Sequence, residues 1–151
     1  AAGCFWGVQA IFDQLPGVLQ TTVGYTGGTK AHPSYELVCT GTTGHAEAVH
    51  ITFDPKKVTY KKLLAIFWMN HEPTTKNRQG PDIGDQYRSA IFYTTEHQKE
   101  RATKSKAAYQ KKCTKPIVTE ITKATPFYPA EDYHQKYYTK HAITCHVKLA
   151  E

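Results

Sequence analysis

Long apolar runs are missing from this chain. Nowhere do about 18 apolar residues follow one another, so no membrane-spanning helix is expected and a membrane is not an expected partner. Internal repeats, low-complexity stretches and linkers are missing as well, which predicts a single domain over residues 1–151. The start at Ala1-Ala2, without a methionine, is consistent with removal of an upstream segment.

Closely spaced cysteine pairs are also absent. The four cysteines are Cys4, Cys39, Cys113 and Cys145, and no two of them form a C-x-x-C pair. The sequence therefore excludes a zinc knuckle and a thioredoxin-type motif. Two disulfides remain conceivable, but a chain of this length can bury a core without them. Catalytic or buried thiols are the better interpretation.

Acidic residues are outnumbered by basic ones, 13 to 19, which gives a formal net charge of +6. Such a charge can indicate a nucleic-acid-binding protein. Many of the basic residues fall within 99–112, however, in a pattern typical of the solvent-exposed face of one helix. No nucleic-acid-binding signature accompanies them, so nucleic acid is not the expected partner.

The hydrophobic pattern alternates between the helical and the strand period. It predicts helices over residues 4–15, 34–40, 59–68, 95–112 and 130–140, and strands over 18–25, 46–53, 87–93 and 116–122. Residues 71–86 are expected to form a long polar loop of the kind that often carries function, and 126–129 a rigid loop. This mixture predicts an α+β fold in which helices cover a sheet.

Cys4 lies between a glycine and an amphipathic helical pattern. Backbone N–H groups and the dipole at a helix N-terminus stabilise a thiolate, which would make Cys4 a nucleophile. A small buried hydrophobe is an equally good interpretation from position alone. The neighbouring Phe5 and Trp6 either line an apolar pocket for a small uncharged group or belong to the core.

Glu47 shares strand parity with Val49, Ile51 and Phe53, on the face that should be buried. Burial raises a carboxyl pKa towards neutrality, which suits a general acid. If the strand end frays, Glu47 meets water instead. Further polar candidates are Tyr35, Asp82, Asp85, Tyr87 and His134.

A metal site is the rival interpretation of the same strand. His45-Ala46-Glu47 matches the H-x-E half of the zinc nucleobase deaminases, but the P-C-x-x-C half is missing. His45 and His50 also have opposite strand parity, so they could not easily share one ion. We therefore expect no metal.

Several runs, in order along the chain, resemble the A-type peptide-methionine sulfoxide reductases, a family acting on the S epimer. These runs are Ala2-Gly3-Cys4-Phe5-Trp6-Gly7, Gly24-Tyr25-Thr26-Gly27-Gly28, Tyr35 with Val38-Cys39, Gly44-His45-Ala46-Glu47-Ala48-Val49, Phe67-Trp68 with Asn70-His71, Asp82 through Gln86-Tyr87-Arg88-Ser89-Ala90-Ile91, Ala124-Thr125-Pro126-Phe127-Tyr128 and Ala130-Glu131-Asp132-Tyr133-His134-Gln135. They extend from the first residues to about Lys140.

The resemblance implies a two-layer α+β sandwich, with a mixed sheet covered by helices and a ferredoxin-like core. It assigns the nucleophile to Cys4, the acid to Glu47 and the methyl-binding aromatics to Phe5 and Trp6. The groups that bind the sulfoxide oxygen and support the site are then Tyr35, Asp82 and Tyr87.

Both ends of the chain depart from the family pattern. Only Ala1-Ala2 remain of the strand that usually precedes the nucleophile. Relatives end in a glycine-rich tail with resolving cysteines, whereas residues 140–147 here read KHAITCHV. Cys145 is the expected resolving cysteine, on a flexible tail over 141–151, with Cys113 as the weaker rival and Cys39 as a structural thiol.

The activity that the resemblance implies is reduction of methionine S-sulfoxide, free and in proteins, as repair of oxidative damage. Cys4 would become a sulfenic acid, form a disulfide and be restored by thioredoxin, without metal or organic cofactor. The expected protein is a cytoplasmic monomer, with an organellar form left open. Two alternatives remain: a cysteine hydrolase with His45 or His134 as its base, and a basic binding module.

Overall fold

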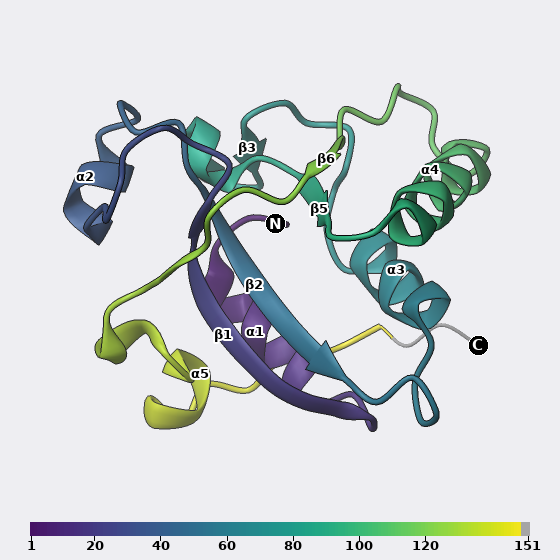
Figure 1. Ribbon diagram of the computed structural model, residues 1–151, viewed down its shortest axis with the longest axis horizontal. Helices are drawn as coiled ribbons and strands as arrows, with labels where there is room; N and C mark the ends of the chain where they lie inside the picture. The colour runs from purple at the N-terminus through teal and green to yellow at the C-terminus, as the bar shows by residue number, and fades with distance from the viewer. Residues whose placement is uncertain (149–151) are drawn as a thin grey trace.

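The computed structural model describes residues 1–148 (Figure 1). The α-helices are α1 (Phe5–Asp13), α2 (Tyr35–Cys39), α3 (Tyr60–Met69), α4 (Glu96–Gln110) and α5 (Tyr137–Lys140), with 3₁₀ turns η1 (Asp85–Tyr87) and η2 (Asp132–His134). The strands are β1 (Val18–Thr26), β2 (Ala46–Phe53), β3 (Arg78–Gln79), β4 (Asp82–Ile83), β5 (Ala90–Tyr93), β6 (Glu120–Lys123) and β7 (Tyr128–Pro129). The predicted α+β class is confirmed.

The strands form three sheets. β1 is the central strand of an antiparallel sheet of order β2-β1-β7, β5 and β6 form a parallel pair, and β3 and β4 form a short antiparallel pair. Helix α1 lies against one face of the long β1–β2 ribbon, while α3 and α4 lie together beside β5 (Figure 1). This arrangement leaves the N-terminal end of α1 next to the start of β2.

Two apolar clusters hold these layers together. The larger joins Val8 and Phe12 of α1 to the buried side chains of α3, including Ile66 and Trp68. The smaller contains Phe5, Val23, Tyr25, Val38 and Ala130, and it lies under the N-terminal end of α1. The spacing of the apolar residues along α1 therefore connects one helix to both clusters.

Local sequence signals place most element boundaries well. The strand predicted over 46–53 is confirmed at both ends. Ser34, Thr59 and Thr95 are N-caps whose hydroxyls accept the backbone N–H three residues later. The strand predictions for 87–93 and 116–122 were too long or displaced, because residues 85–87 form a 3₁₀ turn and the second strand begins at Glu120. The predicted rigid loop over 126–129 ends in a strand pair with β1.

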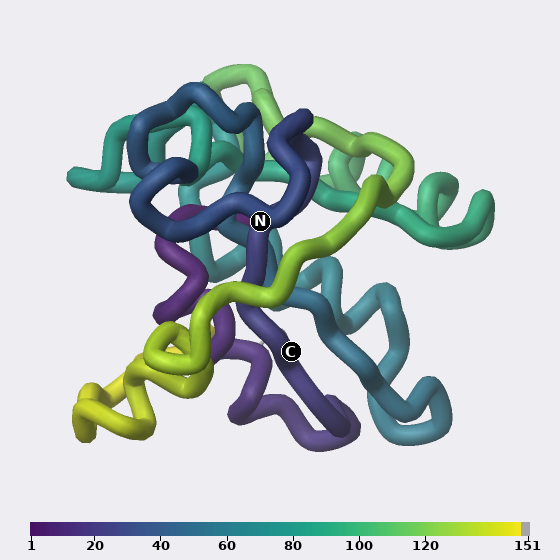
Figure 2. Tube along the Cα trace, turned by 60° about the vertical axis from the view of Figure 1, so that its left-hand side comes forward, coloured from purple at the N-terminus to yellow at the C-terminus, as the bar shows by residue number. Residues whose placement is uncertain are grey.

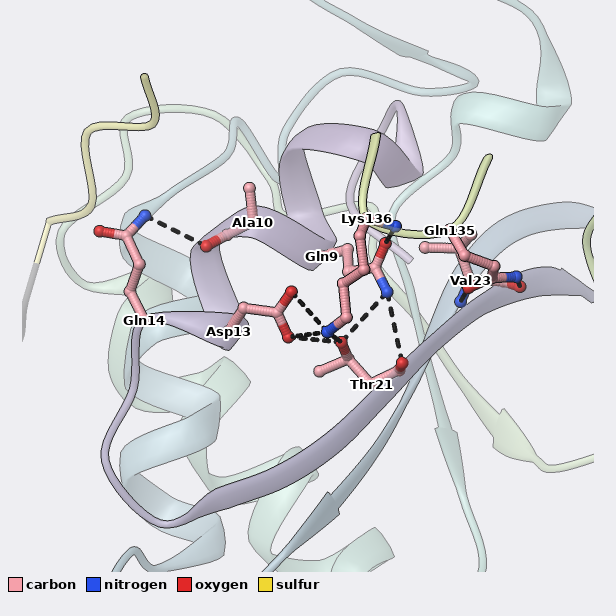
Figure 3. Close-up of polar contacts among 8 residues, drawn as sticks. All are labelled: Gln9, Ala10, Asp13, Gln14, Thr21, Val23, Gln135 and Lys136. Carbon is pink, nitrogen blue, oxygen red and sulfur yellow. Dashed lines mark hydrogen bonds and ion pairs between the residues drawn. The ribbon is translucent and has the colours of Figure 1, made fainter. Parts of the chain in front are cut away.

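The single helix predicted over 130–140 is wrong. Lys136 has a left-handed backbone (φ 57°) and separates η2 from α5. Long-range bonds replace the helical ones: the Gln135 side chain accepts the N–H of Val23 and donates to its carbonyl, and the Lys136 N–H donates to the side chain of Gln9 (Figure 3). The long-range hydrogen bonds of these amide groups stabilise the observed backbone more than a continuous helix would.

An apolar cavity of about 260 Å³ lies between β2, α3 and β5. Its lining includes Val49, Ile51, Leu64, Phe67 and Ile91, and none of the residues that the sequence assigns to the site. Within residues 1–148, no helix is both long and apolar enough to span a bilayer.

Candidate active site

Cys4 is the N-cap of α1, and its thiol faces the backbone N–H groups of Trp6 and Gly7. The approach to Cys4 is fixed by a bridge between Ala2 and Ser89. Gly3 has φ +100°, and a Cβ there would lie 2.7 Å from Cγ of Gln79. Only glycine allows both this backbone angle and this close approach. The turn into α1 therefore places the thiol at the helix N-terminus, as the sequence predicts.

The charge state of this thiol differs from the expectation. Burial raises the pKa of Cys4 to about 11, and the charges of Glu47 and Asp82 add to the effect. The N–H groups of Trp6 and Gly7 lower it, but they do not compensate. The raised pKa favours the neutral thiol at neutral pH, in contrast to the thiolate expected from the helix N-terminus.

Glu47 points into the protein from β2, with only 1% of its surface exposed. The prediction from strand parity is confirmed, and the frayed alternative is excluded because Glu47 pairs with Tyr25 in the β1–β2 ladder. Its Oε1 accepts the N–H of Phe5, 3.1 Å away, while Oε2 has no hydrogen-bond partner within residues 1–148. Burial raises the pKa of Glu47 to about 7, so the carboxyl can both take up and release a proton near neutral pH.

The two aromatics after Cys4 have different environments. Phe5 is 1% exposed and belongs to the smaller core cluster. Trp6 is half-buried, its ring stacks on Tyr137 with centroids 3.8 Å apart and planes at 6°, and its Nε1 donates to Nδ1 of His134 at 2.8 Å. The indole of Trp6 is thus partly accessible, whereas the ring of Phe5 is buried against Tyr25 and His134.

The predicted polar residues gather around the same point. Burial, followed by the charges of Glu47 and three other acidic groups including Cys4, raises the pKa of Tyr87 to about 12. Burial also raises the pKa of Tyr35, whose hydroxyl is hydrogen-bonded to the Cys39 thiol. The charge of Asp82 acts on Cys4, Glu47 and Tyr87. The raised pKa values keep both phenols protonated near Glu47.

Cys145 is not brought to this pocket. Its carbonyl accepts Nε2 of Gln14, the C-cap of α1, at 3.3 Å, and about ten residues of helix place Gln14 about 15 Å from Cys4. A disulfide needs Cα atoms within about 7 Å. Lys148 is held by two bonds to Asn70. The tail through Lys148 therefore rests away from Cys4, and residues 149–151 of the predicted flexible tail lie outside the described residues.

The other two cysteines lie elsewhere. Cys39 is exposed at the end of α2, with its thiol on the Tyr35 hydroxyl. Cys113, after α4, packs against the larger core cluster and lines a polar pocket with His71 and Tyr109. Cys113 therefore lies apart from the group around Cys4, whereas Cys39 is coupled to this group through Tyr35 and the charge of Glu47.

Glu131 is a supporting residue that sequence reasoning missed. Its carboxylate accepts the Tyr25 hydroxyl at 2.9 Å and the backbone N–H of Tyr35 at 3.0 Å. These bonds lower the pKa of Glu131 and fix the start of α2, which carries Tyr35. In the sequence, only its place in the family-like run 130–135 could have indicated this supporting role.

Neither histidine is placed to be the base of a cysteine hydrolase. Nδ1 of His45 accepts the N–H of Gly28 at 3.0 Å, so its Nε2 carries the proton and donates to the carbonyl of Lys30 at 2.6 Å. The lone pair of His134 Nδ1 accepts the Trp6 indole in the same way. In the described part of the chain, no three His, Cys, Asp or Glu side chains are grouped so as to hold a metal ion.

Comparison with known proteins gives a consistent result. The family model described as "Peptide methionine sulfoxide reductase" matches residues 1–151. The peptide methionine sulfoxide reductase MsrA of Methanosarcina acetivorans is 58% identical over 142 residues, which cover 93% of this chain and 76% of that protein.

Solved structures agree with the sequence comparison. Mxr1 from Saccharomyces cerevisiae in reduced form superposes with a TM-score of 0.92 at 36% identity, over 100% of this chain and 90% of the other. The same yeast protein in complex with Trx2 gives a TM-score of 0.67 at 25% identity, over 100% and 86% of the two chains. The lower TM-score is that of Mxr1 bound to Trx2, and the higher one that of its reduced form.

Proposed function

The chain belongs to the peptide methionine sulfoxide reductase family, and we propose that it reduces the S epimer of methionine sulfoxide through Cys4. As a member of this family it is an oxidoreductase that acts on methionine sulfoxide. The buried pair of Cys4 and Glu47 carries the finer proposal, because it combines a sulfur nucleophile with a carboxyl whose pKa of about 7 suits proton transfer.

The reaction needs one proton, and the thiol already holds it. A thiol and a sulfoxide give a sulfenic acid and a thioether, so the Cys4 sulfur gains the oxygen and methionine sulfur is reduced. Glu47 takes the proton of Cys4, leaving a thiolate that attacks the sulfoxide sulfur, and then delivers the proton to the oxygen. In the resulting S–S adduct the hydroxyl moves to the Cys4 sulfur as the S–S bond and the methionine S–O bond break, which leaves the sulfenic acid and the thioether. Proton transfer before attack is consistent with the raised pKa of Cys4, because the thiolate then exists only while Glu47 holds the proton.

Substrate contacts follow from the walls of the pocket. The methyl group rests against the partly accessible indole of Trp6, and the buried ring of Phe5 contributes to the apolar core next to it. The phenols of Tyr35 and Tyr87 stay protonated. Tyr87 donates to the sulfoxide oxygen, and Tyr35 does so after it releases the Cys39 thiol. The negative charge of Asp82 helps to keep Tyr87 protonated. Uncharged donors suit an oxygen whose charge grows and then disappears.

An assay on the separated epimers tests this proposal. We expect reduction of methionine S-sulfoxide, free and within a peptide, and at least about 100-fold slower reduction of the R epimer, because a pocket that fixes both methyl and oxygen admits one configuration. Chiral chromatography of the remaining sulfoxide measures both rates. Equal rates for the two epimers would contradict the proposed geometry, and inertness towards both would contradict the activity.

Cys145 is proposed to resolve the sulfenic acid, with release of water and formation of a Cys4–Cys145 disulfide. The four residues 142–145 can span about 14 Å when extended, so the tail can reach Cys4 after leaving Gln14. The yeast Mxr1 complex with Trx2 supports a thioredoxin as the dithiol that reduces this disulfide. Repair of oxidised proteins by a cytoplasmic or organellar monomer completes the proposal.

Cys145→Ser is expected to complete one turnover and then stall with thioredoxin. The first step does not use the tail, so the burst of methionine should stay within about twofold of wild type, while the steady-state rate falls at least about 100-fold. Quenched-flow product analysis measures both phases. Cys113→Ser is the matched control and should retain steady-state turnover; the reverse result would make Cys113 the resolving cysteine.

A further inference from the structure

The ring of Trp6 is held on two sides by one short segment of chain. His134 accepts its indole N–H at 2.8 Å, and Tyr137 stacks on its face with planes at 6°. Trp6 itself stays half-buried. The segment that provides both contacts, residues 134–137, therefore leaves part of the indole for a substrate while fixing its orientation.

His134 is an unusual choice for a buried position. It is 0% exposed, and its Nε2 has no hydrogen-bond partner within residues 1–148. Because an indole N–H can only donate, Nδ1 must be the acceptor and Nε2 must carry the ring proton. A buried donor without a partner costs free energy that an apolar ring would not. Unlike an apolar ring, the histidine offers Nδ1 as an acceptor for the indole N–H of Trp6.

The segment is fastened to the helix that carries Trp6. The backbone N–H of Lys136 donates to Oε1 of Gln9 at 2.8 Å, and its ammonium reaches both oxygens of Asp13 at 2.7 and 2.8 Å (Figure 3). Gln9 and Asp13 lie one and two turns after Trp6 on α1. The Lys136 ammonium also reaches Oγ1 of Thr21 on β1.

A second fastening ties the segment to the sheet. The Gln135 amide pairs with both the N–H and the carbonyl of Val23, as a strand would. The left-handed backbone of Lys136 then turns the chain so that His134 and Tyr137 meet the same indole. Figure 2 shows this yellow-green segment running alongside the purple first helix. The bonds of Lys136 to α1 and those of Gln135 to β1 thus fix the segment that contacts the Trp6 indole.

We propose that His134 and Tyr137 are positioning residues that hold the Trp6 indole as a rigid wall and so limit the substrate to a methyl sulfoxide. The proposal rests on the proposed role of Trp6 in the function above. A freely turning indole would widen the pocket, and one added methylene would then be tolerated. Selectivity between methionine and ethionine sulfoxide is the property that the segment controls.

The first experiment measures the contact without using activity. The chain has two tryptophans, so Trp68→Phe leaves Trp6 as the only tryptophan, which is excited selectively at a wavelength that the tyrosines do not absorb. In that background we expect His134→Phe to shift the emission maximum of Trp6 by several nanometres and to raise its acrylamide quenching at least twofold. His134→Asn should restore the wild-type values in part, since its Oδ1 takes the place of Nδ1. Unchanged emission and quenching in His134→Phe would overturn the proposal.

The second experiment measures selectivity. For methionine S-sulfoxide, His134→Phe is expected to raise KM about tenfold with kcat within about threefold of wild type, and to reduce the preference over ethionine sulfoxide about tenfold. His97→Phe, at an exposed histidine of α4, is the matched control and should change nothing. A fall in kcat with KM and selectivity unchanged would show a merely structural role and would overturn the proposal.

A third variant covers a folding failure of His134→Phe. Tyr137→Leu, at a half-buried position, removes the stacking partner and should give the same loss of selectivity. An intact preference in folded Tyr137→Leu would count against the proposal. If the wild-type protein reduced no sulfoxide at all, the proposed function would be wrong. The fluorescence experiment would still decide whether residues 134–137 hold the Trp6 indole.

Discussion

Cys4→Ser is expected to lose methionine sulfoxide reduction by more than about 10⁴-fold, the scale of removing a nucleophile. The step leaves oxygen on the attacking atom, and a serine would have to become a peroxide where a cysteine becomes a sulfenic acid. Single-turnover loss of methionine S-sulfoxide, followed by chromatography, measures the effect. Cys113→Ser, which changes a thiol outside the pocket, should keep the wild-type rate.

The same variant should not lose stability. Cys4 is the N-cap of α1 and its side chain makes no capping bond, whereas serine is among the preferred N-cap residues. The melting temperature of Cys4→Ser should therefore equal or exceed that of wild type. If Cys4→Ser is folded but inactive, its loss of activity is due to the missing sulfur and not to unfolding. Substantial activity in Cys4→Ser would remove Cys4 as the nucleophile.

Local pattern was sufficient for the elements that carry the nucleophile and the carboxyl. The strict alternation over 46–53 predicted both β2 and the burial of Glu47, because a strand has only two faces. Capping residues and Pro16 placed the helices for a similar local reason. The individual roles of Tyr35 and Tyr87 came from the family resemblance, since ten tyrosines made composition uninformative.

The segment after β7 could not be predicted in this way. Its backbone is decided by Gln9 and Gln135, whose amides satisfy groups about 110 to 130 positions away in the chain. No periodicity encodes such pairs, and local propensity favoured a helix. The charge state of Cys4 was missed for a related reason: it depends on how deeply the N-terminus of α1 is covered and on Glu47 nearby.

The resting place of Cys145 was equally invisible in the sequence. Its contact with Gln14 joins the tail to the far end of α1, whereas the proposed chemistry needs it at the near end. In the proposed mechanism, reduction of the substrate uses groups that already surround Cys4, whereas the resolution step requires the tail to move. A mutation in the tail should accordingly leave the first turnover intact.

Glu47→Gln is expected to slow the first step by about 10²–10⁴-fold, the range for losing a general acid–base group. In wild type the single-turnover rate should rise as the pH passes about 7, because a Glu47 that already holds a proton cannot take that of Cys4. This limb should disappear in the variant. Glu120→Gln, at a half-exposed carboxyl on β6, should keep the wild-type rate and profile. A first-step rate unchanged by Glu47→Gln would exclude it as the proton carrier.

Glu47→Gln should at the same time stabilise the protein at alkaline pH. Burial raises the folded-state pKa of Glu47 from 4.5 to about 7, so the native state binds more protons in that window. The wild-type free energy of unfolding therefore falls as pH rises from about 4.5 to 7, and the penalty persists above 7. Glutamine carries no charge, so the variant should match wild type near pH 4 and exceed it at pH 8 by up to about 3 kcal/mol. Urea unfolding at the two pH values measures the difference. A protein that becomes more stable while its first step slows would show that the buried carboxyl is kept for proton transfer, whereas equal stability at pH 8 would mean that Glu47 is not buried as an acid of raised pKa.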